Sequence, residues 1–377
     1  MSDMESLLEQ LKTYQDIIVF GTGNVAKAFT ETFKITGLSS RIKYYAVSGA
    51  VLEDTYLNNV PVKQIDCLTE YKDSAVVLIA TADKYCAEIE RKLKCLRFQF
   101  IMYFTFESSN WSILRESFFM RLFAQKGYLY NSWSCQKNSL KYVENLNPKV
   151  KVYMIKSHKD KQLPIKVEKK YADYLIPLQV GKSLTNLSVA SLYDNVGENI
   201  SLRNESFCEL TGHYWIWKNV SVDWVGICHY RRHFELTASD ISMITKSDCD
   251  IVFTVPILNI PSVAAVYAKD HEIEDWSQML DVLKTMYPDY YDTANSVFND
   301  VYYYAYNMMI ARKTVFDEYC SWLFPLLFEI EKRCIQNRTD SYQRRYIGFL
   351  AERLTSLFFI HNSERWKTIF ARKKFYG

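Results

Sequence analysis

Apolar residues near the start of the chain occur as short continuous runs, and the segments between these runs carry apolar residues at helical spacing. The runs IIVF, IKYYAV, AVVLIA and FQFIMYF alternate with the helical segments NVAKAFTETFK and DKYCAEIERKLKCL. Strands that alternate with helices in this way are typical of a doubly wound α/β sheet. The pattern predicts a small Rossmann-like domain over residues 1–108.

A second α/β unit is expected after a helical linker. Residues 109–149 are predicted to be helical and then polar, and they end on Asn147-Pro148. The strand KVYMIKSHK then opens a unit predicted over residues 150–362, which has further strands DWVGICHY and DIVFTVP and a long C-terminal set of helices. Residues 363–377 are expected to form a basic, aromatic tail. The predicted fold class is therefore α/β in both parts.

The composition supports a folded chain with an ample core. Of the 377 residues, 49% are hydrophobic and 24% are charged, which argues against a disordered protein or a coiled coil. Lysine and arginine number 46 and aspartate and glutamate 43, so the formal charge of +3 is too balanced for a protein that coats nucleic acid. Aromatic residues make up 15% of the chain, which we attribute mainly to a tyrosine-rich core.

The cysteines and the N-terminal segment indicate the cellular compartment in which the protein is expected. The nine cysteines are scattered singly, without the C-x-x-C pairs or histidine spacing of a zinc site. The segment MSDMESLLEQLKTYQD is acidic and amphipathic, unlike a signal peptide, and no apolar stretch reaches the roughly 18 residues of a transmembrane helix. We therefore expect a cytoplasmic protein in reducing surroundings.

A glycine-rich turn follows the first predicted strand. The segment GTGNVA, with Gly21, Gly23 and Ala26 at the key positions, fits G-x-G-x-x-[GA] and opens a helix, where glycines let the backbone approach a pyrophosphate. The second strand ends in AVSG, without the acidic residue that would hold the ribose of NAD. The turn is a candidate nucleotide site. Its alternatives are a turn that only starts a packed helix and a working dehydrogenase site.

The strand DWVGICH leads directly into a run of potentially cationic side chains. His229, Tyr230, Arg231, Arg232 and His233 stand at its C-terminal end, where an open α/β sheet places its ligand. Arginine offers forked donors that match phosphate oxygens, so Arg231 and Arg232 are candidates to neutralise a leaving diphosphate. The alternative is a solvated loop whose arginines pair with neighbouring carboxylates.

An acidic pair elsewhere has the spacing of a metal site. Sugar-nucleotide transferases often hold a divalent metal through Asp-x-Asp, and Asp248-Cys249-Asp250 has these letters. The pair precedes the strand IVFTV, however, so its carboxylates are expected at the wrong edge of the sheet. We therefore expect no metal ligands and no required cofactor, with Mn²⁺ or Mg²⁺ disfavoured and the arginines supplying the positive charge.

Five ordered segments carry a family resemblance. They are LIPLQVGKSL, YDNVGENISLRNESFCELTGHYWIWKNVSVDWVGICHYRRHF, KDHEIEDW, YNMMIARKTVFDEYCSWLFPLLFEIEKR and YQRRYIGFLAERL. Over about residues 150–362 they resemble a bacterial family long catalogued as a domain of unknown function. That family occurs in capsule and O-antigen gene clusters and is grouped with GT-A-type glycosyltransferases, including galactofuranosyltransferases. The resemblance implies transfer of a sugar from a UDP-linked donor to a growing surface polysaccharide or lipid-linked glycan.

Donor contacts are expected from the loops that follow the early strands of the second unit. In a transferase of this kind, the turn at His158 after the first strand is a candidate contact for the base or ribose. Asp194 and Asn199, in the loop DNVGENIS, carry groups that hydrogen-bond sugar hydroxyls. The alternative for this loop is an Asx-rich turn that caps the next helix.

An inverting transferase also needs a carboxylate base for the acceptor hydroxyl. The candidates by position are Asp340, at the entry to SYQRRYIGFL, and Glu352, within the helix that follows. Asp340 is equally suited to capping that helix, and Glu352 to pairing with Arg353 or Arg345.

Two further segments are candidates for acceptor or membrane contacts. Asp270 and His271, in KDHEIEDW, are a third possibility for the base and are expected to lie close to the acceptor. The C-terminal residues from Arg365 to Tyr376 interleave cations with rings, which suits peripheral contact with an anionic inner membrane. The alternative is a frayed C-terminus.

The leading hypothesis is therefore a glycosyltransferase that uses a nucleotide-sugar donor and a glycan acceptor and binds no nucleic acid. Two alternatives stay open. One is an NAD(P)-dependent sugar-nucleotide oxidoreductase or epimerase that works through the Gly21–Gly23 turn, and the other is a non-enzymatic scaffold.

Overall fold

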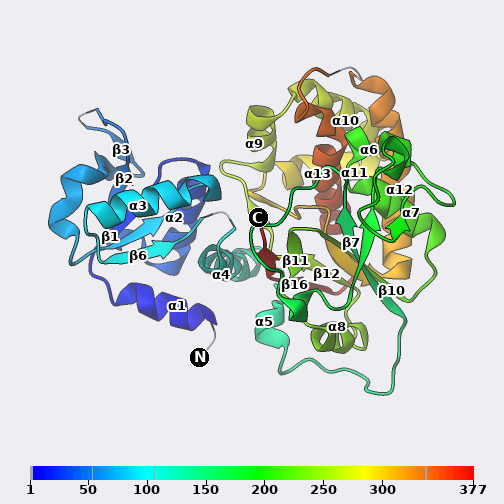
Figure 1. The fold of residues 1–377 in the computed structure, drawn as a ribbon, viewed down its shortest axis with the longest axis horizontal. Helices are drawn as coiled ribbons and strands as arrows, with labels where there is room; N and C mark the ends of the chain where they lie inside the picture. The colour runs from blue at the N-terminus through cyan, green and yellow to red at the C-terminus, as the bar shows by residue number, and fades with distance from the viewer. Residues whose placement is uncertain (1–2, 53, 106, 336–337) are drawn as a thin grey trace. The chain divides into compact units, whose positions relative to one another are not determined.

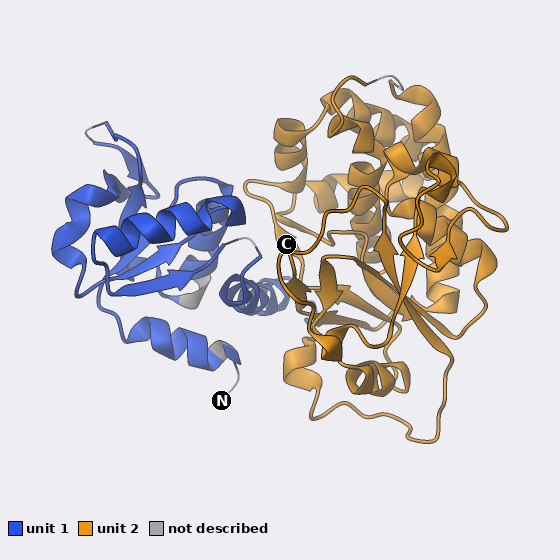
Figure 2. Cartoon of the chain, viewed as in Figure 1, with its two compact units in different colours: residues 1–130 blue, residues 131–377 orange. Residues whose placement is uncertain are grey.

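The computed structural model describes residues 3–52, 54–105, 107–335 and 338–377. The chain divides into two compact units, Met1–Tyr130 and Asn131–Gly377 (Figure 2). The boundary falls inside the segment that was expected to be a linker. Both units are mixed α/β structures with parallel strands, which confirms the predicted fold class.

The first unit is a Rossmann-like sheet with helices. Its six strands run in the order β3-β4-β2-β1-β5-β6, all parallel except the antiparallel β3–β4 pair (Figure 1). The strands are β1 (Ile17–Phe20), β2 (Ile42–Val47), β3 (Tyr56–Leu57), β4 (Val60–Gln64), β5 (Val76–Ile79) and β6 (Phe100–Tyr103). The helices are α1 (Asp3–Lys12), α2 (Asn24–Thr36), α3 (Cys86–Cys95) and α4 (Ser109–Gln125).

The predicted linker supplies part of this first unit. Helix α4 packs against α1 and α2, and its N-cap Ser108 accepts a hydrogen bond from the Trp111 backbone N–H. Strands β1 and β5 are buried along their whole length. Central parallel strands are covered on both faces, which is why they appear in the sequence as continuous apolar runs.

The second unit is built on a larger, mostly parallel sheet. Its main strands lie in the order β16-β12-β15-β10-β7-β8-β9, and only β15 is antiparallel to its neighbours. These strands are β7 (Val150–Lys156), β8 (Leu175–Gln179), β9 (Leu192–Tyr193), β10 (Trp224–His229), β12 (Ile251–Thr254), β15 (Met309–Arg312) and β16 (Thr368–Ala371). Strand β11 (Arg232–Phe234) pairs with β10 and with β17 (Lys373–Phe375), while β13 (Ile257–Leu258) pairs with β14 (Tyr302–Tyr303).

The strand order of this unit creates a switch point. From β7 the chain moves outward through β8 and β9 on one side, and then places β10 on the other side of β7. Strands β7 and β10 are parallel, with Ile155 opposite His229. Ligands of open α/β sheets bind where the strand order reverses, outside the carboxyl ends of the two strands. The carboxyl ends of β7 and β10 are therefore the first place to look for a site.

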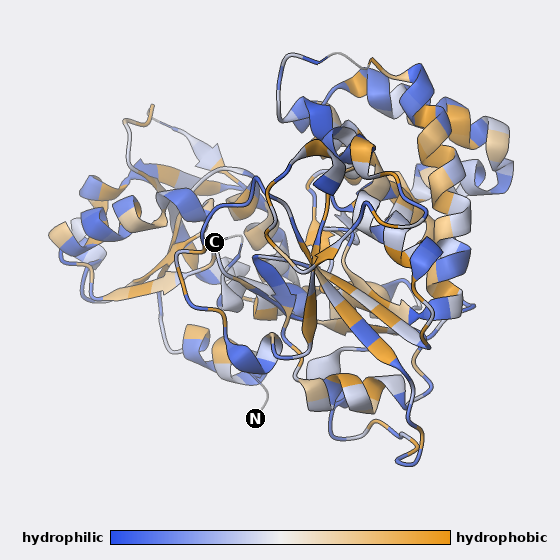
Figure 3. Cartoon of the chain, turned by 45° about the vertical axis from the view of Figure 1, so that its right-hand side comes forward, coloured by the Kyte–Doolittle hydropathy of each residue, from blue (hydrophilic) through white to orange (hydrophobic). Residues whose placement is uncertain are grey.

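Helices rich in aromatic residues complete the second unit. They are α5 (Trp133–Gln136), α6 (Asn204–Phe207), α7 (Leu210–Asn219), α8 (Ala238–Thr245), α9 (Val263–Asp270), α10 (Ile273–Met286), α11 (Pro288–Phe298), α12 (Lys313–Arg333) and α13 (Tyr346–His361). Figure 3 shows apolar residues along the central strands and mixed positions along the helices. Trp217 of α7 stacks on Phe324 of α12 with ring centroids 5.7 Å apart. Many of the rings thus form a core, as the composition predicts.

The C-terminal residues 363–377 differ from the expected tail. They form β16, which pairs with β12, and β17, which pairs with β11. Phe370, in β16, and Tyr376, directly after β17, are each 2% exposed. These rings are therefore part of the fold and cannot rest on a membrane. Within the described ranges, no helix combines the length and the apolar run needed to cross a bilayer.

Candidate functional site

Three guanidinium groups surround a neutral histidine at the carboxyl end of β10. His229 is the last residue of this strand, and its Nε2 is buried without a hydrogen-bond partner. Burial lowers the pKa of His229 to about 3, and the positive charges of Arg232, Arg345 and Arg231 lower it further. The ring is therefore uncharged at neutral pH, and the positive charge of this region comes from the arginines.

The second histidine of the run is uncharged as well. His233, in β11, is 1% exposed and packs edge-on against the ring of Tyr376 at 5.1 Å. Burial lowers its pKa to about 4. The histidines of this run, expected as potential cations, are thus neutral because the fold encloses them.

Two of the arginines rest on aromatic rings instead of carboxylates. The Arg231 guanidinium lies 5.8 Å from the Tyr230 ring centroid and 5.7 Å from that of Phe375. That of Arg345 lies 5.4 Å from the Phe349 centroid. In the part of the chain that the structure describes, no carboxylate lies within ion-pair distance of either guanidinium. Neither guanidinium therefore forms the direct carboxylate pair that the solvated-loop alternative expects.

The C-terminal strand β17 lies beside Arg232 and adds another cation, Lys373. In the β11–β17 pair, Arg232 lies opposite Phe375. The Arg232 guanidinium is 5.0 Å from the Phe375 centroid and 4.7 Å from that of Tyr306, and Lys373 Nζ is 4.9 Å from the same Tyr306 centroid. Lys373, Phe375 and Tyr306 were not among the predicted site residues. The only signal for the first two was the alternation of cations and rings near the C-terminus.

The turn after β7 faces the same cluster. Asp160 Oδ2 accepts a hydrogen bond of 2.7 Å from the Ser157 N–H, which shapes the turn that carries the half-buried His158. Burial raises the pKa of Asp160, and the positive charges of Lys156 and Arg231 oppose this shift. The Tyr230 N–H donates a 3.0 Å hydrogen bond to the Ile155 carbonyl, so the two predicted donor segments meet at the switch point.

Two carboxylates lie beside the arginines. Glu352 of α13 accepts hydrogen bonds from the Tyr306 N–H at 2.9 Å and from Arg353 Nη1 at 3.0 Å, one on each oxygen. Burial is the main cause that raises its pKa, and the negative charge of Glu209 adds to it. Glu209, directly before α7, accepts a 2.7 Å hydrogen bond from Asn307 Nδ2 on Oε1. Glu209 was not predicted as a site residue.

Backbone strain is concentrated around these carboxylates. Among the described residues of the second unit, the only non-glycine residues with left-handed φ are Cys208 (50°), Tyr306 (71°) and Asn307 (49°). Such conformations cost about 1–3 kcal/mol each and cluster at functional sites. Cys208 adjoins Glu209, and Tyr306 and Asn307 donate to Glu352 and Glu209 respectively. The sequence contains no local signal of this strain.

Asp194 holds the fold of the neighbouring loops. Its carboxylate is fully buried and accepts hydrogen bonds from the backbone N–H groups of Gly181 (2.9 Å) and Lys182 (3.1 Å) and from the hydroxyls of Ser201 (2.6 Å) and Thr211 (2.7 Å). Both oxygens are thus occupied by protein donors. The carboxylate acts as a structural anchor between the loop after β8 and helix α7.

Two other predicted residues make local turns. The exposed Asn199 donates to the Gly197 carbonyl at 2.8 Å and accepts from the Ser201 N–H, as in the Asx-turn alternative. The exposed Asp340 accepts a 2.8 Å hydrogen bond from the Tyr342 N–H and so caps the turn before α13.

The predicted acceptor residues differ from each other in environment. Asp270 is exposed at the end of α9, and its carbonyl accepts from Gln343 Nε2. His271 stacks on Phe349 with centroids 4.1 Å apart, and burial lowers its pKa to about 4 with a contribution from Arg345. His271 therefore adjoins the arginine cluster, whereas Asp270 faces solvent.

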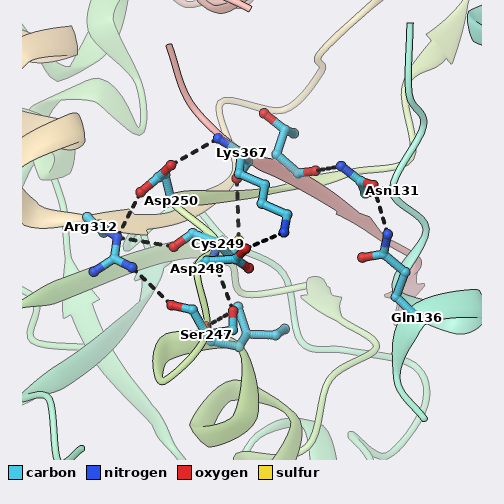
Figure 4. A network of polar contacts seen from close by, with 10 residues as sticks. Asn131, Gln136, Ser247, Asp248, Cys249, Asp250, Arg312 and Lys367 are labelled. Carbon is cyan, nitrogen blue, oxygen red and sulfur yellow. Dashed lines mark hydrogen bonds and ion pairs between the residues drawn. The ribbon is translucent and has the colours of Figure 1, made fainter. Parts of the chain in front are cut away.

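The Asp-x-Asp segment is part of a structural network (Figure 4). Asp250 accepts hydrogen bonds from Arg312 Nε (2.8 Å) and from the Lys367 N–H (2.9 Å), while Asp248 pairs with Lys367 Nζ at 2.5 Å. Strand β12 begins after this segment, at Ile251. The carboxylates lie at the amino end of β12, as expected, and basic groups of the protein occupy them.

In the glycine-rich turn of the first unit, packing explains why one residue, Gly21, is glycine. Gly21 has φ of 129°, and a Cβ there would lie 2.5 Å from the Ala80 carbonyl oxygen, so packing at the ends of β1 and β5 requires glycine. Gly23 caps α2 and has open space around it, and Ala26 is buried in that helix. Strand β2 ends at Val47. A nucleotide site at this turn stays a prediction.

The fold and the site together define an open-sheet α/β protein with an arginine cluster at a switch point. Residues 151–363 match the model of the family described as a domain of unknown function, DUF4422, and the chain belongs to this family. A solved structure, that of the WbbM bifunctional glycosyltransferase in its apo state, is similar with 25% sequence identity and a TM-score of 0.50. The match covers 60% of this chain and 45% of that chain. No curated protein matches the sequence.

Proposed function

We propose that residues 131–377 form a glycosyltransferase that moves a sugar from a nucleotide-sugar donor to a glycan acceptor. The observation that carries this proposal is the arginine cluster at the carboxyl ends of β7 and β10, where Arg231 and Arg345 have no carboxylate partner within ion-pair distance among the described residues. Family membership and the likeness to a bifunctional glycosyltransferase support the same function.

The chemistry of the cluster suits a departing nucleoside diphosphate. When the bond between the sugar and the diphosphate breaks, negative charge develops on the phosphate oxygens. Guanidinium groups that are already in place stabilise this charge without reorganisation. Because His229 is neutral, the positive charge does not depend on a group that titrates near neutral pH. We propose that Arg231 and Arg232 provide this charge without a divalent metal or another cofactor.

The finer assignment follows the family resemblance. We propose UDP-galactofuranose as the donor and a capsule or O-antigen polysaccharide, free or lipid-linked, as the acceptor. We also propose a GT-A-type catalytic domain that acts in the cytoplasm, at the inner face of the membrane where lipid-linked acceptors are made. His158 is proposed to contact the nucleotide, because its turn also carries Asp160, on which Arg231 acts. His271 is proposed to contact the acceptor, because it stacks on Phe349, which Arg345 also contacts.

Binding of UDP provides the first test. Each guanidinium that contacts a phosphate contributes about 1.5–3 kcal/mol, so Arg231→Ala and Arg345→Ala should each weaken UDP binding about 10- to 100-fold by calorimetry. Arg365→Ala is the matched control, because Arg365 is in an exposed pair with Glu318 at 2.6 Å and should leave binding unchanged. Equal UDP affinity in all four proteins would contradict the proposed site.

Turnover provides the second test. The protein is incubated with UDP-sugars, including UDP-galactofuranose, and a synthetic acceptor, and release of UDP is measured with and without chelator. We expect turnover that survives the chelator and is lost in the Arg231→Ala variant. Turnover that vanishes with chelator and returns with Mn²⁺ would refute the metal-free mechanism, and absence of turnover with every donor would refute the function.

A further inference from the structure

One carboxylate of the site has a free oxygen. Glu209 Oε1 accepts the hydrogen bond from Asn307 Nδ2, whereas Oε2 accepts no hydrogen bond from any residue that the structure describes. Glu209 is half-buried, so Oε2 is held in the site by the bond to the other oxygen and still reachable. A base must be able to approach the proton that it removes. Glu209 meets this requirement.

The two carboxylates predicted from the sequence, Glu352 and Asp340, are less suited than Glu209 to accept a proton from the acceptor. Glu352 uses one oxygen for the Tyr306 N–H and the other for Arg353, in an ion pair whose side chains are 17% and 5% exposed respectively. To accept a proton it would have to give up one of these contacts in a buried site. Asp340 is exposed and caps a turn. Glu352 is therefore occupied on both oxygens. Asp340 uses one oxygen for a local turn and, among the described residues, has no side-chain contact that would fix it beside the arginines.

Glu209 also lies next to the proposed diphosphate site. The thiol of Cys208, the preceding residue, accepts a hydrogen bond from Arg345 Nε at 3.4 Å. Arg345 in turn acts on His229 at the end of β10. Arg345 thus links the segment that carries Glu209 to the end of β10, where the diphosphate would be held. A sugar bound to that diphosphate would have its anomeric carbon close to Glu209.

We propose that Glu209 is the catalytic base of the proposed glycosyltransferase, an inference that rests on the function proposed above. Glu209 Oε2 takes the proton of the acceptor hydroxyl, whose oxygen forms the new bond to the anomeric carbon. The bond from that carbon to the diphosphate oxygen breaks, and its electron pair leaves with the nucleoside diphosphate. The displacement is direct, so the anomeric configuration is inverted. Asn307 is a positioning residue, because it fixes Oε1 and so directs Oε2.

The test uses the full chain with the donor that the wild-type protein turns over. Glu209→Gln keeps the size and the contact to Asn307 but removes the base, so kcat should fall about 10²- to 10⁴-fold while the Kd for UDP and the unfolding midpoint stay unchanged. Glu205→Gln is the matched control. Glu205 lies nearby on α6 in an exposed 3.6 Å pair with Lys159, and the variant should have wild-type kcat.

Two further measurements separate a base from a structural residue. The acidic limb of the kcat/KM profile against pH should be present in the wild type and absent in Glu209→Gln. In Asn307→Ala that limb should persist with a lower kcat. Inversion at the anomeric carbon is read from the product by NMR.

The outcomes are distinct from those for the function itself. If the wild-type protein turns over no donor, the proposed function fails. If it turns over a donor, three results would each overturn the assignment of Glu209. They are a Glu209→Gln variant with wild-type kcat, a product that retains the donor configuration, and a Glu209→Gln variant whose loss of kcat is matched by loss of stability.

Discussion

Replacement of Asp194 by asparagine tests whether this residue binds the donor or holds the fold. Four protein donors converge on its buried carboxylate, two on each oxygen. In Asp194→Asn one oxygen keeps its two donors and the amide NH₂ faces the other two. The hydroxyl of that second pair can rotate and accept from the amide. The backbone N–H cannot, so one buried donor loses its acceptor.

The expected loss of stability follows from this geometry. A buried donor without an acceptor costs about 1–3 kcal/mol, and the remaining hydrogen bonds weaken by about 1 kcal/mol in total when the acceptor loses its charge. The free energy of unfolding should fall by about 2–4 kcal/mol. With a urea m-value of about 3 kcal/mol/M, the unfolding midpoint falls by about 1 M.

Tryptophan fluorescence is a suitable assay, because all tryptophans except Trp111 belong to the second unit. The control is Asp173→Asn, the same change at an exposed aspartate of that unit, which should leave the midpoint unchanged. UDP affinity of folded Asp194→Asn should stay within about twofold of wild type. An unchanged midpoint together with weaker UDP binding would show that Asp194 is a donor ligand and would refute the structural role.

Two further predictions concern the aromatic support of the cations and the buried histidines. Phe375→Ala removes a ring that contacts both Arg231 and Arg232, and each cation–π contact contributes about 0.5–1 kcal/mol. The variant should therefore bind UDP about 5- to 30-fold more weakly by calorimetry. Unchanged affinity would contradict a role for this ring. Burial lowers the pKa of His213, His229, His233 and His271 to about 4, 3, 4 and 4. The unfolded chain protonates these histidines near pH 6.5, whereas the folded chain does so only near pH 4 or below. The free energy of unfolding should therefore fall as the pH drops from 6.5 towards 4, by at most about 1.4 kcal/mol per pH unit for each histidine. Glu352 and Asp160, whose pKa values are raised, act in the opposite direction, and a urea midpoint that rises between pH 7.5 and 5.5 would show that they dominate.

The parts of the fold that were predictable are those with a local pattern. Strands β1, β5 and β10 were found because they are apolar runs that neighbours cover, whereas the apolar run of β7 is interrupted by the exposed Lys151. The end of β10 could be identified as a site because its position in a parallel sheet fixes which edge it reaches. Strands β11 and β17 could not be predicted, because each has only three residues and they pair with each other from distant parts of the chain.

The same distinction holds within the site. Arg231 and Arg232 stand directly after a recognisable strand, whereas Glu209 becomes a candidate only through Asn307, which lies on a distant segment. Asp194 was predicted to bind the donor because its loop is rich in hydrogen-bonding groups. What decides its role is full burial among four donors, and burial of one side chain depends on the tertiary structure.

The aromatic content of the chain has a second cause besides the core. The proposed site needs positive charge that is positioned but not neutralised. A carboxylate partner would position an arginine and cancel its charge, whereas an aromatic ring contacts the guanidinium face and leaves the N–H donors at its edge free for phosphate oxygens. The rings of Tyr230 and Phe375 contact Arg231 in this way, and the ring of Phe349 contacts Arg345. By contrast, the Asp248–Asp250 network at the amino end of β12 pairs each cation with a carboxylate, and no charge there remains for a ligand. For Arg231 and Arg345, contact with a ring instead of a carboxylate therefore distinguishes the candidate site from the structural network.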